Sequence, residues 1–198
     1  MNHRESGKAA DKESGKAADI LKSGLVLLIV TAVAGMCLGF VYELTREPIQ
    51  YQLELALYES MGAVLPQADT YYEVEDFEPT SALFNLTRGE AGGSVVGYII
   101  GASRSGYSGR IDVLVGLDTE GTIQGINILN HSETPGLGAN ATRPDFTDQF
   151  KGNYERVSTT RATPSQNEIV VITASTITTD AIVQAVNEAL GFFEANLR

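Results

Sequence analysis

Apolar residues follow three patterns along the chain: a continuous run near the N-terminus, short alternating runs in the middle, and helical spacing at the end. The continuous run, SGLVLLIVTAVAGMCLGFVY, occupies residues 23–42 and contains no charged side chain. About 20 such residues form a helix of roughly 30 Å, the thickness of the hydrocarbon part of a bilayer. The sequence therefore predicts a transmembrane helix at residues 23–42.

Two other interpretations of this run compete with a retained anchor. A cleaved signal peptide would use Ala-Val-Ala at residues 32–34 as its cleavage site, but the apolar run continues beyond them. A lipoprotein signal would be acylated at Cys37, yet Met36 stands where a small residue is expected. We expect the anchor to be retained.

Basic residues flank the predicted span unequally. Those that precede it are Arg4, Lys8, Lys12, Lys16 and Lys22, whereas only Arg46 follows closely. Because positively charged flanks stay in the cytoplasm, we expect a polar cytoplasmic tail at residues 1–22 and the C-terminal domain outside the cytoplasm. The chain would be a single-pass protein of the inner or plasma membrane. The tail carries the direct repeat ESGKAAD at residues 5–11 and 13–19, a composition that predicts disorder.

The residues between the span and the domain show helical spacing. Apolar positions over residues 48–65 predict an amphipathic helix that Pro66 ends. Residues 43–70 are therefore expected to form a juxtamembrane helix and linker.

From residue 71 onward the apolar period changes to two. Three runs at residues 94–100, 111–117 and 122–129, separated by turns such as Asp118-Thr-Glu-Gly121, predict successive antiparallel strands. A further strand at 168–172 leads into a helix at 179–193 with one apolar face. The expected class is α+β: a single N-terminal transmembrane helix, then one domain at residues 71–198 with an antiparallel sheet and flanking helices.

Composition removes several function classes. The formal net charge is -11, from 14 Lys and Arg against 25 Asp and Glu, which excludes a nucleic-acid-binding surface. The single cysteine, Cys37, and two histidines are too few for a disulfide, an iron-sulfur centre or a His-ligated metal site. Common nucleotide-binding and hydrolase motifs are also missing. We expect no metal and no complete active site within the chain itself.

The first unusual stretch, HSETPGLGA, covers residues 131–139 directly after a predicted strand. Its Thr134-Pro-Gly136 core suits a type II turn, because Pro presets φ and Gly supplies a positive φ. An ordinary surface turn explains this as well. Glycines at 136 and 138 would alternatively let a flat ring approach the backbone.

The second stretch, ITASTITTD, covers residues 172–180 at a strand-to-helix junction and is rich in hydroxyl groups. Simple helix capping would place Thr178 or Thr179 at the N-cap. Alternatively, first-turn N–H groups and hydroxyls would hold a phosphate, with one threonine oxygen free for covalent modification. No Lys or Arg occurs between Arg161 and Arg198, so we expect such a phosphate to depend on backbone dipoles and a tether rather than on an ion pair.

Together these stretches resemble the FMN-binding domain of the G subunit of Rnf electron-transport complexes and of its relative, the C subunit of Na+-translocating NADH:quinone reductase. The family's attachment motif, Ser/Thr-Gly-Ala-Thr-x-Thr-Ser, lies over residues 173–179, and its ETPGLG is unaltered at residues 133–138. Residues 146–152 and the Gly106-Tyr107 turn are also similar. The resemblance covers roughly residues 21–190.

The resemblance implies a covalent cofactor. The hydroxyl of Thr176 would carry FMN as a phosphodiester, attached by a flavin transferase that uses FAD. The residues expected to hold the phosphate and ribityl end are Ser175, Thr178 and Thr179. Those expected to line the ring are Gly106, Tyr107, Glu133, Thr134, Gly136, Leu137 and Gly138.

One part of the attachment motif departs from the family pattern. Ala174-Ser175 replaces the usual Gly-Ala, so a left-handed backbone at Ala174 would be strained. Ser175 competes with Thr176 as the acceptor, and Asp180 would slightly repel a phosphate.

The resemblance also implies a complex. Electrons would pass through the FMN between other membrane and iron-sulfur subunits of an ion-translocating ferredoxin:NAD+ oxidoreductase that moves Na+ or H+. The chain length favours this over the quinone-reductase subunit. Two alternatives are a stand-alone membrane flavin carrier and, in a different class, a cofactor-free membrane-tethered scaffold.

Overall fold

The computed structural model describes the backbone of residues 3–198 and side chains from residue 21 onward. The chain forms two compact units, residues 1–53 and residues 54–198. One long helix, α1 (His3–Val64), runs through the first unit and contributes its last turns to the second.

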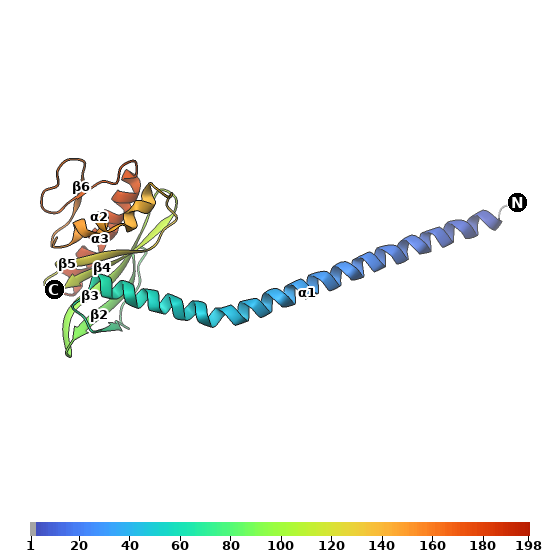
Figure 1. Ribbon diagram of the computed structural model, residues 1–198, viewed down its shortest axis with the longest axis horizontal. Helices are drawn as coiled ribbons and strands as arrows, with labels where there is room; N and C mark the ends of the chain where they lie inside the picture. The colour runs from blue at the N-terminus through green and yellow to red at the C-terminus, as the bar shows by residue number, and fades with distance from the viewer. Residues whose placement is uncertain (1–2) are drawn as a thin grey trace. The chain divides into compact units, whose positions relative to one another are not determined.

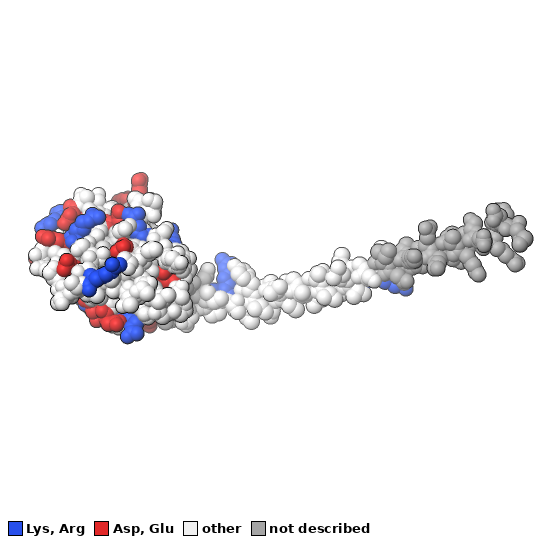
Figure 2. Space-filling model, turned by 90° about the horizontal axis from the view of Figure 1, so that it is seen from above, with Lys and Arg blue, Asp and Glu red and all other residues white. Residues whose placement is uncertain are grey.

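Helix α1 contains a segment that is long and apolar enough to cross a membrane. Its large apolar side chains from Leu25 to Tyr42 are exposed, and Figure 2 shows the middle of this helix without charged side chains. The hydroxyl of Thr31 donates to the carbonyl of Leu27 at 2.9 Å, so this polar group is satisfied inside the helix. Membrane-spanning helices need this internal pairing.

The structure changes two expectations for the N-terminal region. The tail was expected to be disordered, but α1 begins at His3, in a segment whose Ala, Lys and Glu are good helix formers. The helix predicted at residues 48–65 is confirmed up to Val64, but it is not a separate element, because α1 continues through Pro48. Pro48 lacks only the N–H that would bond the carbonyl of Leu44, and the rest of the helical ladder on either side remains.

The second unit is built on an antiparallel sheet in chain order, β1-β2-β3-β4-β5. The strands are β1 (Thr70–Glu73), β2 (Leu83–Ala91), β3 (Ser94–Ser105), β4 (Arg110–Asp118) and β5 (Ile123–Asn130). The three antiparallel strands predicted from alternation are confirmed as β3, β4 and β5. The expected turn after β4 is also present, with Gly121 at φ +90° and its N–H donating to the carbonyl of Asp118 at 3.1 Å.

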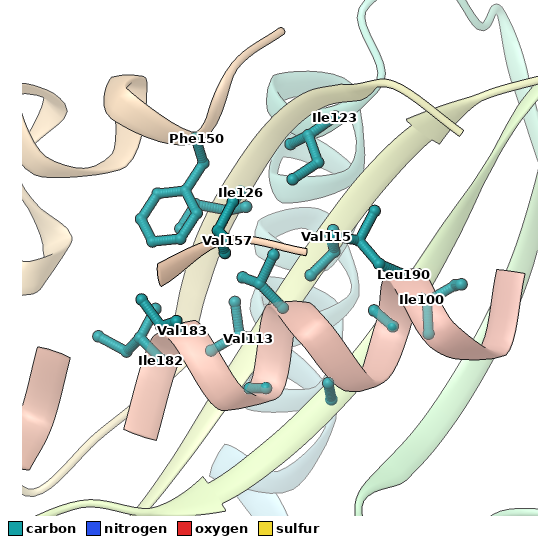
Figure 3. Packing of buried hydrophobic residues seen from close by; sticks show 14 of the residues in the cluster. Ile100, Val113, Val115, Ile123, Ile126, Phe150, Val157, Ile182, Val183 and Leu190 are labelled. Atoms are coloured by element: carbon teal, nitrogen blue, oxygen red, sulfur yellow. The ribbon is translucent and has the colours of Figure 1, made fainter. Parts of the chain in front are cut away.

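The α+β class is confirmed, with helices covering both faces of the sheet. Helix α3 (Thr176–Asn196) packs against the face that carries Ile100, Val113 and Val115, as Figure 3 shows. The alternate residues Ile99 and Leu114 point to the other face. They pack there against Val64 and Leu65, at and just after the end of α1. The last turns of α1 therefore belong to the core of the domain.

Short elements connect β5 to α3. They are η1 (Gly138–Thr142), α2 (Pro144–Thr147), η2 (Asp148–Phe150), β6 (Ser158–Thr160) and β7 (Glu168–Val170). Figure 1 shows α2 and α3 over the same side of the sheet, where Phe146 and Phe150 are buried. The strand expected at residues 168–172 is confirmed as β7, but it pairs in parallel with β6 and not with the main sheet.

Candidate functional site

A pocket of about 480 Å³ lies where three segments of the second unit meet. These segments are the loop after β3, the segment after β5 and the beginning of α3. The residues that line it are Tyr107, Glu133, Thr134, Leu137, Gly138, Ala174, Ser175, Thr176, Ile177 and Thr178. The structure thus brings together the two unusual stretches of the sequence, which lie far apart along the chain.

Most residues expected at the site line this pocket, but three do not. Gly106 and Thr179 contact residues of the pocket walls from behind, whereas Gly136 is exposed in the turn beside the pocket. Ala174 and Ile177 also line the pocket, and they were not predicted because neither side chain carries a polar group.

The segment after β5 begins with the predicted tight turn. The N–H of Leu137 donates to the carbonyl of Thr134 at 3.1 Å, and Gly136 has φ +79°. These values confirm the type II turn, in which Gly is favoured at the third position because a side chain there is strained. The turn places Thr134 and Leu137 on the pocket wall.

Glu133 connects all three walls of the pocket. Its Oε1 accepts from the backbone N–H of Ser108 at 2.9 Å, and its Oε2 accepts from the hydroxyl of Thr178 at 2.6 Å. Only 6% of Glu133 is exposed, so it lines the pocket while its carboxylate points into the protein. It therefore fixes the walls to one another.

Close packing around this carboxylate explains two glycines. A Cβ at Gly106 would lie 2.6 Å from Oε1 of Glu133. A Cβ at Gly138 would lie 2.5 Å from Oε2 and 2.8 Å from the hydroxyl oxygen of Thr178. These distances are too short for a Cβ atom, so the glycines permit the close approach of backbone to carboxylate.

The beginning of α3 assigns different roles to its three threonines. Thr179 donates to the carbonyl of Ser175 at 3.0 Å and accepts from the N–H of Ile172 at 3.1 Å, which ties the junction together. Thr178 donates to Glu133. Both are buried, whereas Thr176 is half-buried at the pocket. Thr176 is thus the threonine whose oxygen remains accessible.

The helix begins three residues earlier than predicted, at Thr176. Ser175 is the N-cap, without a side-chain capping hydrogen bond, so the interpretation with Thr178 or Thr179 as N-cap was wrong. Propensity did not reveal this start because Thr and Ile are poor helix formers. The contacts of Thr178 and Thr179 with Glu133 and Ile172 stabilise this first turn.

The backbone at Ala174 is left-handed, with φ +60°. This confirms the strain expected where Ala replaces the family's glycine. For an L-residue this conformation costs roughly 1–2 kcal/mol. Ser175, the alternative acceptor, is only 7% exposed.

A basic side chain contacts the accessible threonine, contrary to expectation. Nη2 of Arg161 donates to Oγ1 of Thr176 at 3.2 Å. The sequence holds no Lys or Arg between Arg161 and Arg198, but Arg161 itself folds back onto the helix. Nothing in the local sequence around Arg161 indicates this contact, which depends on the β6–β7 pairing.

A polar cluster at the base of the β3–β4 loop holds its two strands together. Nε of Arg110 donates to Oδ1 of Asp112 at 2.6 Å, and the hydroxyl of Ser103 donates to the same oxygen. Burial alone would raise the pKa of Asp112, but these hydrogen bonds and the charge of Arg110 outweigh it and lower the pKa. The carboxylate is ionised at neutral pH and supports the loop that carries Tyr107.

Comparison with known proteins agrees with this geometry. Residues 106–191 match the family model described as FMN-binding domain, and residues 14–64 match the one described as RnfG N-terminal region. The G subunit of the Na(+)-translocating ferredoxin:NAD(+) oxidoreductase complex of Acetobacterium woodii is 32% identical over 88% of this chain and 92% of its own. The G subunit of the ion-translocating oxidoreductase complex of Methanosarcina acetivorans is 30% identical over 89% of this chain and 96% of its own. The chain belongs to the family of G subunits of ion-translocating oxidoreductase complexes.

The fold of this family member has a counterpart among solved structures. The C subunit of the Na(+)-translocating NADH-quinone reductase of Parabacteroides distasonis superposes with a TM-score of 0.52 at 21% identity, over 64% of this chain and 76% of that one. This likeness concerns the fold alone. Every residue that lines the pocket falls within residues 106–191, the part of the sequence that matches the FMN-binding domain.

Proposed function

We propose that this chain is the electron-transfer subunit of an ion-translocating ferredoxin:NAD+ oxidoreductase complex, with FMN joined to Thr176 as a phosphodiester. The observation that carries the proposal is the state of Thr176. It is the accessible threonine at the beginning of α3, it lines the pocket, and its oxygen accepts a hydrogen bond from a cation. Helix N-termini and guanidinium groups both favour phosphate.

The residues present fit FMN. The pocket volume of about 480 Å³ lies within the range of sites for small molecules. Tyr107, Leu137 and Ile177 supply exposed apolar surface beside it, with 74%, 42% and 56% of each residue exposed. Such surface suits a flat aromatic ring, while the polar end of the pocket at the beginning of α3 suits the phosphate.

The division of work between cofactor and chain follows from these contacts. FMN, when bound, supplies the capacity to accept and donate electrons. Thr176 holds the phosphate, Ser175, Thr178 and Thr179 form the turn around it, and Glu133 keeps the pocket walls in register. The apolar side chains around the pocket exclude water from the ring. The covalent bond prevents loss of the cofactor into the surrounding water.

The membrane-spanning segment determines on which side of the membrane the FMN lies. Residues 23–42 span the membrane, residues 1–22 stay in the cytoplasm because of their basic residues, and the domain at residues 71–198 lies outside. Residues 43–70 link the two, and their C-terminal part packs against the sheet. The partners are the other membrane and iron-sulfur subunits of the complex and a flavin transferase that matures the chain.

Covalent attachment is tested by intact mass. The full chain is produced with a flavin transferase, and we expect one FMN per chain with the loss of one water, together with a fluorescent band that survives boiling in detergent. Thr176→Ala should lose both signals. Thr173→Ala is the matched control, because Thr173 is exposed and does not line this pocket.

Three results would contradict the assignment. A wild-type chain without added mass excludes covalent FMN. Modification that persists in Thr176→Ala moves the bond elsewhere, and its loss in Ser175→Ala alone would place the bond at Ser175. In the last two cases, proteolysis and mass analysis identify the peptide that carries the flavin.

A further inference from the structure

Arg161 is the one cation that the described residues place against the acceptor oxygen. Nη2 of Arg161 lies 3.2 Å from Oγ1 of Thr176. Among residues 21–198, whose side chains the structure describes, no carboxylate forms an ion pair with Arg161. By contrast, four other arginines of the domain form ion pairs with acidic side chains: Arg88, Arg104, Arg110 and Arg143. The charge of Arg161 is therefore available to a ligand.

The backbone that carries Arg161 is held in place although its side chain is exposed. Immediately before Arg161, strand β6 pairs with β7, and the N–H of Val171 donates to the carbonyl of Thr160 at 3.0 Å. On the other side of β6, the side-chain amide of Asn187 on α3 bonds both the N–H and the carbonyl of Val157, at 2.8 and 2.9 Å. The segment is thus fixed to the same helix that begins with Thr176.

We propose that Arg161 is a phosphate-binding residue that positions the FMN phosphate during and after its attachment to Thr176. This inference rests on the proposed function. In the attachment step, Oγ1 of Thr176 bonds to the FMN phosphorus of FAD, the anhydride bond breaks, AMP leaves and the hydroxyl proton is released. After attachment the FMN phosphorus would be bonded directly to Oγ1. The unesterified phosphate oxygens would then come within reach of the Arg161 guanidinium.

Charge explains why one arginine matters here. The chain has a net charge of -11, and FAD is itself an anion, so their approach is opposed by repulsion. The planar guanidinium can donate two N–H groups to one phosphate, and the first-turn N–H groups of α3 add to its effect. Because the Arg161 hydrogen bond uses a lone pair of Oγ1, the O–H of Thr176 stays free to lose its proton.

The first test follows transfer of FMN with time. The purified full-length chain is mixed with a purified flavin transferase and FAD, and the modified fraction is read by intact mass. We expect Arg161→Gln to slow transfer about tenfold, the lower end of what one charge-assisted hydrogen bond contributes. Arg161→Lys should restore part of the rate. Arg156→Gln is the matched control, because Arg156 is exposed and lines a different depression.

Salt separates the charge of Arg161 from a structural role. An exposed charge is screened by salt, so the ratio of wild-type to Arg161→Gln rates should shrink toward one as the salt concentration rises to about 1 M. A ratio that does not change with salt, or no difference between the two proteins at low salt, would overturn the inference. Thermal unfolding of each variant shows whether it is folded. If Arg161→Gln does not fold, Arg161→Lys replaces it in the comparison with wild type.

Free ligands give a second measure that does not involve the transferase. FMN and riboflavin differ only by the phosphate, and quenching of flavin fluorescence reports binding of each to the unmodified chain. We expect Arg161→Gln to weaken FMN binding and to leave riboflavin binding unchanged. Equal losses for both ligands would contradict a phosphate-specific role.

The outcomes also distinguish this inference from the proposed function. If the wild-type chain never acquires FMN, the covalent assignment fails and takes the inference with it. If the wild-type and Arg161→Gln chains acquire FMN at the same rate, only the role of Arg161 is wrong.

Discussion

Residue 133 shows how one buried carboxylate holds a site together without facing the ligand. Its two oxygens accept from Ser108 N–H and from the Thr178 hydroxyl, which belong to two different walls. The backbone N–H of Glu133 is in turn bonded to Nδ1 of His131 at 3.2 Å. The charge also lies near the beginning of α3, where the helix dipole favours an anion.

Removing this carboxylate should destabilise the domain. We expect Glu133→Ala to lower the free energy of unfolding by about 2–3 kcal/mol, because it leaves the part-buried N–H of Ser108 and the buried hydroxyl of Thr178 without their acceptor. Glu133→Gln should lose less, since its amide oxygen can still accept from Ser108. Denaturant unfolding of the detergent-solubilised chain measures both. Glu120→Ala, in the exposed β4–β5 turn, should change the free energy of unfolding little. An equally small effect of Glu133→Ala would contradict the role of Glu133 in fixing the pocket walls to one another.

Ala174 stores strain beside the acceptor. Ala174→Gly should raise the free energy of unfolding by about 0.5–1 kcal/mol, because removing left-handed strain outweighs the added freedom of glycine in the unfolded chain. A thermal shift of a few degrees upward is the expected reading. Ala195→Gly, at an exposed helical position of α3, should shift the midpoint downward. A downward shift for Ala174→Gly as well would show that its φ is not strained.

At the scale of elements, the sequence predicted those that alternate cleanly and missed those that do not. Strands β3, β4 and β5 contain short runs of apolar and small residues, because both faces of these strands are buried over much of their length. Strand β2, LFNLTRGEA, contains Asn, Arg, Gly and Glu, so no period is visible. It forms because β1 and β3 supply its partners on both edges.

The helices show a similar limit. The body of α3 was predicted from its apolar face, but its first turn was not, since that turn is stabilised by contacts with Glu133 and Ile172. Pro48 suggested a boundary within α1 that local helical propensity on both sides overrides. Helix boundaries that depend on distant contacts, or on the sum of many small helical propensities, therefore cannot be predicted from one segment of the sequence.

For the site, adjacency in sequence decided what could be predicted. The two stretches at residues 131–139 and 172–180 are contiguous and carry unusual residue types, so they were found. Ala174 and Ile177 lie inside the second stretch but carry no polar group. Arg161 is separated from Thr176 by strand β7 and a turn, and only the folded chain brings them together.

For the molecule as a whole, the distribution of charge agrees with a protein that works at a membrane surface. The apolar stretch of α1 is uncharged, while the second unit carries acidic and basic side chains over the face shown in Figure 2. An excess of acidic residues disfavours contact with anionic lipid headgroups.

Orientation in the membrane provides the last prediction. The positive flank at residues 4–22 should hold the N-terminus in the cytoplasm, with the domain on the other side. In a Cys37→Ser background, a membrane-impermeant maleimide applied to intact cells should label Glu78→Cys, which lies in the exposed β1–β2 loop. In cells with an outer membrane, the outer membrane alone is first made permeable to the reagent. Ser14→Cys should react only after the inner membrane is opened. Labelling of Ser14→Cys alone in intact cells would reverse the topology and place the flavin site in the cytoplasm, and labelling of both would exclude a retained inner-membrane anchor.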